Sequence, residues 1–182
     1  MTIVVTGAAG FIGSNFVLNW LTHSKEKVIA LDKLTYAGNL ENLKSVESNP
    51  NYSFVHGDIG DSTLIGKLLQ EHQPSAIINF AAESHVDRSI HGPDDFMQTN
   101  ILGTYRLLEE ARSFFNTLSE EGQKQFRFLH VSTDEVYGTL SSTDPAFKET
   151  KQYEPNSPYS ASKAASDHLV RAWHHTYGLP VL

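Results

Sequence analysis

The sequence predicts an α/β fold built on one doubly wound parallel sheet. Short apolar runs alternate with helical patterns along the 182 residues. Because the runs are apolar on both faces, the strands that they predict belong to a parallel sheet covered by helices on both sides. Right-handed crossovers between such strands give the doubly wound arrangement, in which ligands are expected at the carboxyl ends of the strands.

Five strands and five helices are expected, in alternation. The predicted strands are Ile3–Thr6, Val28–Leu31, Ser53–Val55, Ala76–Phe80 and Phe128–Ser132. The predicted helices are Phe11–Thr22, Leu40–Glu47, Ser62–Glu71, Asp94–Leu118 and Ser160–Tyr177. Loops are expected at Thr35–Asn39 and at Thr139–Pro158, which carries three prolines.

The composition limits the classes of function. The net charge is -7 and no basic run occurs, so we expect no nucleic-acid partner and no binding to an anionic membrane. The chain has no cysteine, which excludes disulfides, thiolate metal sites and a cysteine nucleophile, and we expect no metal centre. The N-terminus lacks the features of a signal peptide and no run reaches membrane-spanning length, so we expect a cytoplasmic protein.

The end of the chain resembles the beginning of another strand. Leu179–Leu182 adds a further apolar run after the last predicted helix. A domain seldom stops where a strand begins. We therefore expect residues 1–182 to be one domain of a longer protein, interrupted at the start of a sixth strand.

A glycine-rich turn, Gly7-x-x-Gly10-x-x-Gly13, joins the first strand to the first helix. One glycine allows the tight turn, a second lets a pyrophosphate approach the backbone, and a third lets the helix pack closely on the strand. The helix N-terminus offers free N–H groups and a partial positive charge to the phosphates. Because the spacing differs from G-x-G-x-x-G, a purely structural turn is the alternative.

A carboxylate at the end of the second strand favours the dinucleotide interpretation. Asp32 follows Gly13 by nineteen residues, where it can accept hydrogen bonds from the ribose hydroxyls of an adenosine and repel a 2′-phosphate. This favours NAD over NADP as the cofactor. The neighbouring Lys33 could attract that phosphate, and an aspartate that only caps a turn is the structural alternative.

Two further strand ends carry groups suited to the same ligand. Asp58 follows the third strand and could meet the adenine edge. After the fourth strand, Ala81 and Ala82 leave room for a flat ring or a ribose, and Ser84 and His85 could form hydrogen bonds. For His85, an ordinary loop histidine is an equally good interpretation.

Two stretches late in the chain are suited to acid–base chemistry. Asp134 and Glu135 leave the fifth strand together, and their surroundings can make one an acid and the other a base. Tyr159 and Lys163 share a helix face through their i, i+4 spacing. A nearby ammonium lowers the pKa of a tyrosine from about 10, so that its phenolate can take a proton from a substrate hydroxyl. An exposed acidic turn and an amphipathic helix face are the structural alternatives.

These motifs together resemble the extended short-chain dehydrogenase/reductase family. The resemblance extends over the whole chain and rests on Gly7-x-x-Gly10-x-x-Gly13, Asp32, Asp58, Asn100-x-x-Gly103-Thr104, Thr133 and Tyr159-x-x-x-Lys163. Within the family, residues 31–39, 81–87 and 133–138 resemble the nucleotide-sugar 4,6-dehydratases. The pair Asp134 and Glu135 discriminates best, because related 4-epimerases usually lack both carboxylates.

The resemblance implies a Rossmann domain that holds NAD as a prosthetic group and acts on a nucleotide sugar. The residues that it assigns to the cofactor are Gly7, Gly10, Phe11, Ile12, Gly13, Asp32, Lys33, Leu34, Thr35, Asp58, Ile59, Phe80, Ala81, Ala82, Thr99, Tyr159 and Lys163. It places Ser84 and Thr133 against the sugar. It also implies that a C-terminal substrate domain is absent here, and that the two longest predicted helices form the bundle of a homodimer.

The resemblance further implies a reaction by oxidation, elimination and reduction. Tyr159 takes the proton of the sugar C4 hydroxyl, Thr133 bonds the same oxygen, and hydride passes from C4 to the cofactor. Glu135 then removes the C5 proton, and Asp134 protonates the leaving C6 hydroxyl. Hydride finally returns to C6 and a proton to C5. Lys163 completes the catalytic set. The alternatives are a 4-epimerase or decarboxylase of the same fold, and a non-catalytic NAD-binding regulatory domain, which does not need an acid, a base and a phenolate together.

Overall fold

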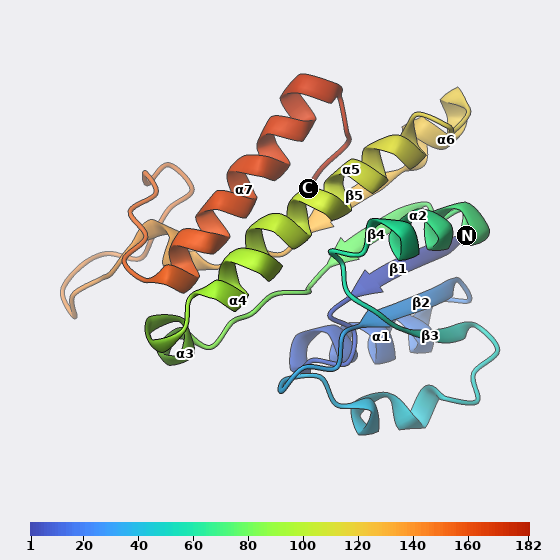
Figure 1. Cartoon of the computed structure of the whole chain (residues 1–182), viewed down its shortest axis with the longest axis horizontal. Helices are drawn as coiled ribbons and strands as arrows, with labels where there is room; N and C mark the ends of the chain where they lie inside the picture. The colour runs from blue at the N-terminus through green and yellow to red at the C-terminus, as the bar shows by residue number, and fades with distance from the viewer.

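A computed structural model describes residues 1–182 and has a five-stranded sheet with helices on both faces (Figure 1). The strands are β1 (Thr2–Thr6), β2 (Lys27–Asp32), β3 (Tyr52–His56), β4 (Ala76–Asn79) and β5 (Arg127–His130). Their order is β3-β2-β1-β4-β5, and every pairing is parallel. The chain thus winds outward from β1 to β3 and returns to β4, which confirms the doubly wound sheet.

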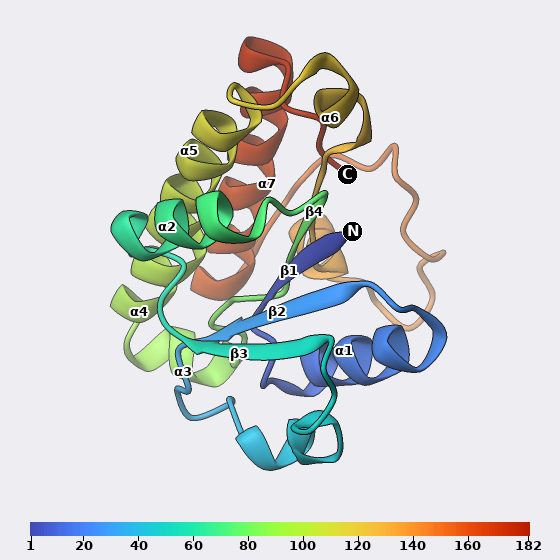
Figure 2. The ribbon, with the colours of Figure 1, turned by 90° about the vertical axis from the view of Figure 1, so that its right-hand side faces the viewer.

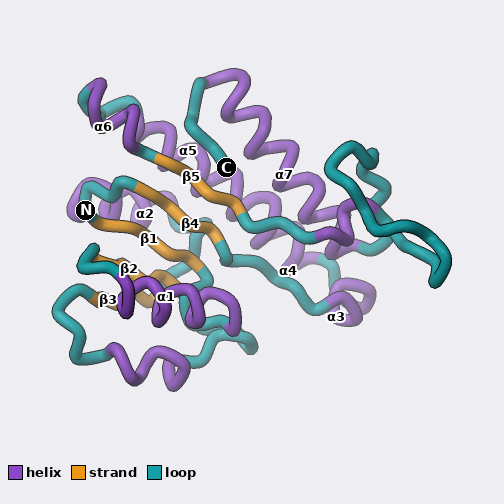
Figure 3. Tube along the Cα trace, turned by 180° about the vertical axis from the view of Figure 1, so that it is seen from behind, coloured by secondary structure: helices purple, strands orange, loops and turns teal.

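Both faces of the sheet are buried, as the apolar runs predict. Val4 and Ile29 belong to a core on one face, under helices α2 (Ser62–His72), α5 (Thr104–Phe115) and α7 (Pro158–Tyr177). Val5 and Val28 belong to a second core on the other face, under α1 (Phe11–His23) and η1 (Leu40–Val46). Successive side chains alternate across the sheet, so each strand serves both cores. Figures 2 and 3 show the two helical layers from the side and from behind.

Two predicted helices differ from the structure. The segment predicted as Leu40–Glu47 is the 3-10 helix η1. The single helix predicted at Asp94–Leu118 is divided into α4 (Asp94–Phe96), a π-helical segment η2 (Met97–Gly103) and α5, which ends at Phe115. Three short helices lie where none is predicted, because six residues or fewer show no apolar period. They are α3 (Val86–His91), α6 (Glu120–Gln125) and the 3-10 helix η3 (Asp134–Tyr137).

The last residues lie along β5, as expected of a further strand. Val181 forms a parallel bridge with Phe128, whose N–H donates to the Pro180 carbonyl at 2.9 Å. Residues 139–157 contain no regular helix or strand, as predicted. None of the helices combines the length and apolar character needed to cross a membrane.

Candidate active site

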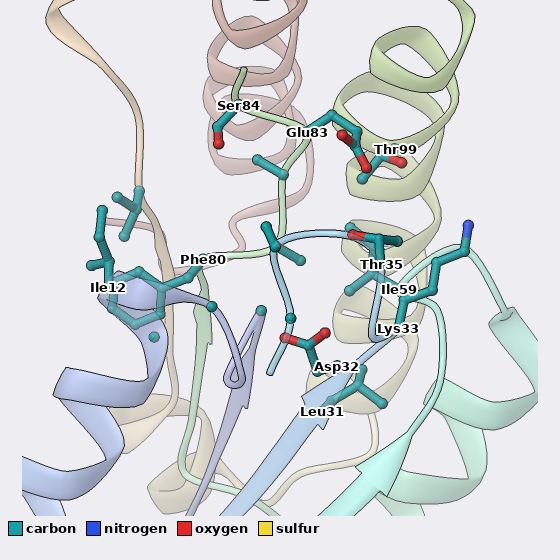
Figure 4. A pocket seen from close by; sticks show the side chains of 18 of the residues that line it. Ile12, Leu31, Asp32, Lys33, Thr35, Ile59, Phe80, Glu83, Ser84 and Thr99 are labelled. Carbon is teal, nitrogen blue, oxygen red and sulfur yellow. The ribbon is translucent and has the colours of Figure 1, made fainter. Parts of the chain in front are cut away.

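A cavity of about 420 Å³ opens at the carboxyl ends of the strands, where β1 and β4 lead the chain to opposite sides (Figure 4). This is the topological switch point at which open α/β sheets hold ligands. Every residue predicted for the cofactor lines this cavity except Leu34, and so does Ser84. Further lining residues that the sequence did not single out for the cofactor are Leu31, Ala37, Gly38, Gly57, Glu83, Val131 and Ser132.

Leu34 is the predicted cofactor residue that lies outside the lining of the cavity. Its backbone is left-handed, with φ 55°, and its side chain packs against the core beneath α1. The backbone N–H of Leu34 nevertheless helps to hold a residue of the cavity in place, because it donates a hydrogen bond to Asp32 Oδ1 at 2.7 Å.

In the glycine turn, a side chain would collide with the backbone at Gly7 and Gly13 but would have space at Gly10. Gly7 has φ +63°, and a Cβ there would lie 2.7 Å from the Ala81 nitrogen. A Cβ on Gly13 would collide with the Gly7 carbonyl, whereas one on Gly10 would approach nothing nearer than 3.4 Å. Gly10 is also the N-cap of α1, which has no side-chain cap and no acidic residue in its first turn. The N-terminus of α1 is thus open to an anion in the cavity.

Asp32 is a buried carboxylate held by the backbone. It accepts hydrogen bonds from the Ala9 N–H at 2.8 Å and the Leu34 N–H at 2.7 Å. Next to it, the Lys33 ammonium lies 2.8 Å from Asp58 Oδ2. This hydrogen bond raises the pKa of Lys33, and it lowers the pKa of Asp58 against the opposing effect of burial. The charge of Lys33 is therefore balanced, which weakens the alternative that it attracts a 2′-phosphate.

Among the lining residues that sequence reasoning missed, Glu83 is the one with an ionisable side chain. Its backbone N–H and carbonyl are both held by the Asn100 side chain, at 2.8 and 2.9 Å. The residue is 8% exposed, yet Oε2 has no hydrogen-bond partner in the protein. In Figure 4 its side chain lies beside Thr99 at the cavity. The Oε2 atom is itself buried from solvent, so the cavity presents other atoms of the Glu83 side chain to a ligand.

The helix α7 carries Tyr159 and Lys163 into the cavity. It begins at Pro158, two residues before the predicted start, because Ser157 and Ser160 form a reciprocal capping box. The Lys163 ammonium donates to the Val131 carbonyl at 2.6 Å. Burial lowers the pKa of Lys163 to about 8.

The predicted lowering of the Tyr159 pKa is wrong for the chain by itself. Burial raises the pKa of Tyr159; a hydrogen bond with Thr133 opposes this, and the charges of Glu135 and Asp134 add to it. Lys163 does not offset these effects, because its ammonium is directed at the Val131 carbonyl. The structure nevertheless brings Tyr159 close to Thr133 and to both carboxylates, as the sequence predicts.

Val131 and Ser132 line the main cavity, but residues 133–135 turn away from it. Thr133 caps η3 by accepting the Glu135 N–H at 3.3 Å. Thr133 and Asp134 line a neighbouring cavity of about 430 Å³, while Glu135 is half-buried and lines neither. Thr133 therefore does not share the main cavity with Ser84. His85 is exposed and lines neither cavity, in agreement with an ordinary loop histidine.

The glycine turn, the aspartate at the end of β2 and the helix with Tyr159 and Lys163 meet at one cavity of a Rossmann sheet. This combination defines the extended short-chain dehydrogenase/reductases. Within that class, the chain belongs to the GDP-mannose 4,6 dehydratase family, whose model matches residues 4–182.

Relatives of known function are similar over the whole chain. The dTDP-glucose 4,6-dehydratase of Xanthomonas campestris pv. campestris (strain B100) is 64% identical over 181 residues, and that of Escherichia coli is 57% identical over 190. Each alignment covers all of this chain but only 51% and 52% of the relative. The chain thus spans about half the length of the curated relatives that it matches.

Solved structures show the same fold in two kinds of enzyme. A dTDP-glucose 4,6-dehydratase from Streptomyces venezuelae, with NAD and TYD bound, matches with a TM-score of 0.89 at 48% identity. A UDP-glucose 4-epimerase from Thermotoga maritima, with UDP-glucose, matches with a TM-score of 0.83 at 30% identity. Both matches cover the whole chain, and 54% and 53% of those structures. The fold by itself does not separate the two activities.

Proposed function

We propose that the protein carrying this chain is an NAD-dependent nucleotide-sugar 4,6-dehydratase that converts dTDP-glucose to dTDP-4-keto-6-deoxyglucose. The observation that carries the proposal is the meeting of Tyr159 with Thr133, Asp134 and Glu135 beside the cofactor cavity. An elimination of water needs an acid and a base in addition to the group that assists oxidation, and these four side chains supply all three. The identity with dTDP-glucose 4,6-dehydratases supports the same substrate.

The residues at the cavity fit NAD. The open N-terminus of α1 and the space at Gly10 suit a pyrophosphate, and Asp32 suits the hydroxyls of the adenosine ribose. Glu83 adds an acidic side chain to the wall of the same cavity. When bound, NAD supplies the acceptor and later the donor of a hydride. Because Asp32 repels a 2′-phosphate and Lys33 is paired with Asp58, we expect NAD to be preferred over NADP.

The side chains around Tyr159 divide the proton transfers. Tyr159 accepts the proton of the sugar C4 hydroxyl, and Thr133, which forms a hydrogen bond with Tyr159 in the free chain, bonds the same C4 oxygen. Glu135 removes the proton at C5, and Asp134 gives a proton to the hydroxyl that leaves from C6. Lys163, of which one N–H is held by the Val131 carbonyl, keeps donors free for the ribose next to the nicotinamide.

The test is an assay of the whole protein with dTDP-glucose, in which the absorbance of the 4-keto product is followed in alkali. Formation of the C4 epimer with no keto sugar would make the protein an epimerase instead. Binding of NAD without turnover of any nucleotide sugar would favour the non-catalytic regulatory domain. The cytoplasmic location expected from composition stays a prediction, to be checked by cell fractionation.

The role of Glu135 is tested separately by Glu135→Gln. We expect C4 oxidation to proceed, seen as a rise of NADH absorbance on rapid mixing, while release of water is blocked. Glu120→Gln, an exposed change on α6, is the matched control and should leave both steps intact. Normal loss of water in the Glu135 variant would contradict the assignment of the base.

We also propose that two copies of the protein pair through α5 and α7. These helices lie side by side (Figure 1) and are bridged by the edge-to-face pair Tyr105–Trp173, with centroids 5.8 Å apart. Around this pair, Leu102 is 40%, Tyr105 41% and Tyr177 46% exposed. Exposed aromatic groups on adjoining helices are typical of interfaces.

A further inference from the structure

Asp167 is a nearly buried carboxylate that joins three parts of the chain. It lies one helical turn after Lys163 on α7, and its side chain is 12% exposed. Asp167 Oδ2 accepts the Ser132 hydroxyl at 2.5 Å and the Tyr153 hydroxyl at 3.0 Å. Ser132 follows β5 and Tyr153 belongs to the loop before α7, so this one oxygen connects the strand end, the loop and the helix.

His130 approaches the other oxygen of Asp167 and extends the contact across the sheet. The Thr6 hydroxyl donates to Asn79 Oδ1 at 2.5 Å, which directs the Asn79 amide nitrogen to His130 Nδ1 at 3.1 Å. His130 Nδ1 therefore accepts, and its proton is on Nε2, which lies 3.1 Å from the Ser166 hydroxyl and 3.6 Å from Asp167 Oδ1.

The hydrogen-bond network of Asp167 and His130 also includes Ser166, which belongs to the helix that carries Tyr159 and Lys163. The Ser166 hydroxyl donates to the Lys163 carbonyl at 2.8 Å. Polar side chains thus connect β1, β4, β5 and α7 at the strand ends that border the cofactor cavity. Buried polar networks in which each group has a partner rigidify the segments that they join.

We propose that Asp167 is a positioning residue for Tyr159 and Lys163, which it serves by anchoring α7 to the end of β5 and by placing one negative charge one helical turn from Lys163. The proposal rests on the proposed function only for the roles given to Tyr159 and Lys163. Asp167 itself does not line the cofactor cavity.

The charges around Lys163 support this role. Asp167, on the same helix, opposes the effect of burial and raises the pKa of Lys163. On β5, His130 is neutral, because burial and then the charge of Lys163 lower its pKa to about 3. The carboxylates of η3 and Asp167 itself all raise the pKa of Tyr159, so the effect of Asp167 on the pair is to favour protonated Tyr159 as well as charged Lys163. Asp167 is therefore the group that favours the charged form of Lys163.

The experiment measures the titration of Lys163 in the whole protein without cofactor. Competitive acetylation with acetic anhydride over a range of pH, read at each lysine by mass spectrometry, reports the titration directly. In Asp167→Asn we expect the pKa of Lys163 to fall by roughly one unit. Glu120→Gln, an exposed change of the same charge on α6, should not move it. Asp167→Glu restores the charge and is expected to restore the titration.

A second variant separates positioning from folding. Tyr153→Phe removes one hydrogen bond of Asp167 and leaves its charge, so it should lower the thermal midpoint without moving the titration of Lys163. If Asp167→Asn and Tyr153→Phe lower the midpoint alike and neither moves the titration, Asp167 is only a structural residue and the proposal is overturned. The titration of Lys163 needs neither substrate nor turnover. Its result therefore tests the role of Asp167 independently of the dehydratase assay.

Discussion

Glu83 shows how a single residue can be read in two ways. Along the sequence it is one acidic residue in a polar loop, and ordinary solvation accounts for it. In the fold, Asn100 holds its backbone, and the side chain becomes a buried wall of the cavity with one oxygen unpartnered. The burial of this carboxylate comes from contacts with segments that are distant in the sequence, so the sequence alone does not reveal it.

We predict that Glu83→Gln weakens NAD binding by roughly tenfold, because a hydrogen bond to a charged acceptor contributes about 1.5 kcal/mol. The free protein should lose no stability, since the variant removes a buried charge. Isothermal titration with NAD and urea unfolding measure the two effects. The exposed change Glu71→Gln serves as the control, and a Glu83 variant that is destabilised but binds NAD normally would contradict the assignment.

His130 predicts a pH dependence of stability. Its folded pKa of about 3 lies below the ordinary value of 6.5, so the unfolded chain binds more protons and stability falls as pH drops through this interval. Between pH 7 and pH 4.5 we expect a loss of about 2.5 kcal/mol from this residue. Urea unfolding at the two pH values should show a smaller loss in His130→Gln than in the unchanged protein. His175→Gln, on the exposed end of α7, should keep the full loss.

At the scale of one element, two glycines of the same turn have different roles, one in folding and the other in binding the cofactor. Gly7 has a positive φ and a near contact with Ala81, so Gly7→Ala should cost about 2–3 kcal/mol of stability. A Cβ on Gly10 has space, so Gly10→Ala should fold normally but obstruct the pyrophosphate and weaken NAD binding. Thermal unfolding and NAD titration of the pair test this. Equal loss of stability in both variants would show that the turn is structural throughout.

The segment η2 also shows the limit of periodicity. The apolar pattern of residues 94–118 predicts one helix, but a π-helical stretch interrupts it. Within that stretch Asn100 is buried and its amide joins the Glu83 backbone to the Ser162 hydroxyl at 2.8 Å. Segments of this kind are frequent at functional sites, and here the stretch also carries Thr99 to the cavity.

For the whole molecule, the exposed aromatic groups on α5 and α7 predict a dimer. Tyr105→Glu places a charge in the proposed interface and should raise the dimer dissociation constant at least tenfold. Leu140→Glu is the matched control, because Leu140 is equally exposed at 41% but lies in the loop before α7. Sedimentation velocity over a range of protein concentrations measures both. An unchanged dimer in the Tyr105 variant would place the interface elsewhere.

The sequence by itself determined the parallel sheet, the position of the cavity at its switch point and most of the residues around that cavity. Apolar runs, glycines and strand-end carboxylates depend on local backbone geometry and on period, which a sequence displays directly. The tertiary structure decided the pairing of Lys33 with Asp58, the burial of Glu83 and the contacts of Asp167. It also decided the pKa of Tyr159, because burial and charges from distant segments set it. Such effects arise only when the folded chain excludes water and brings those segments together.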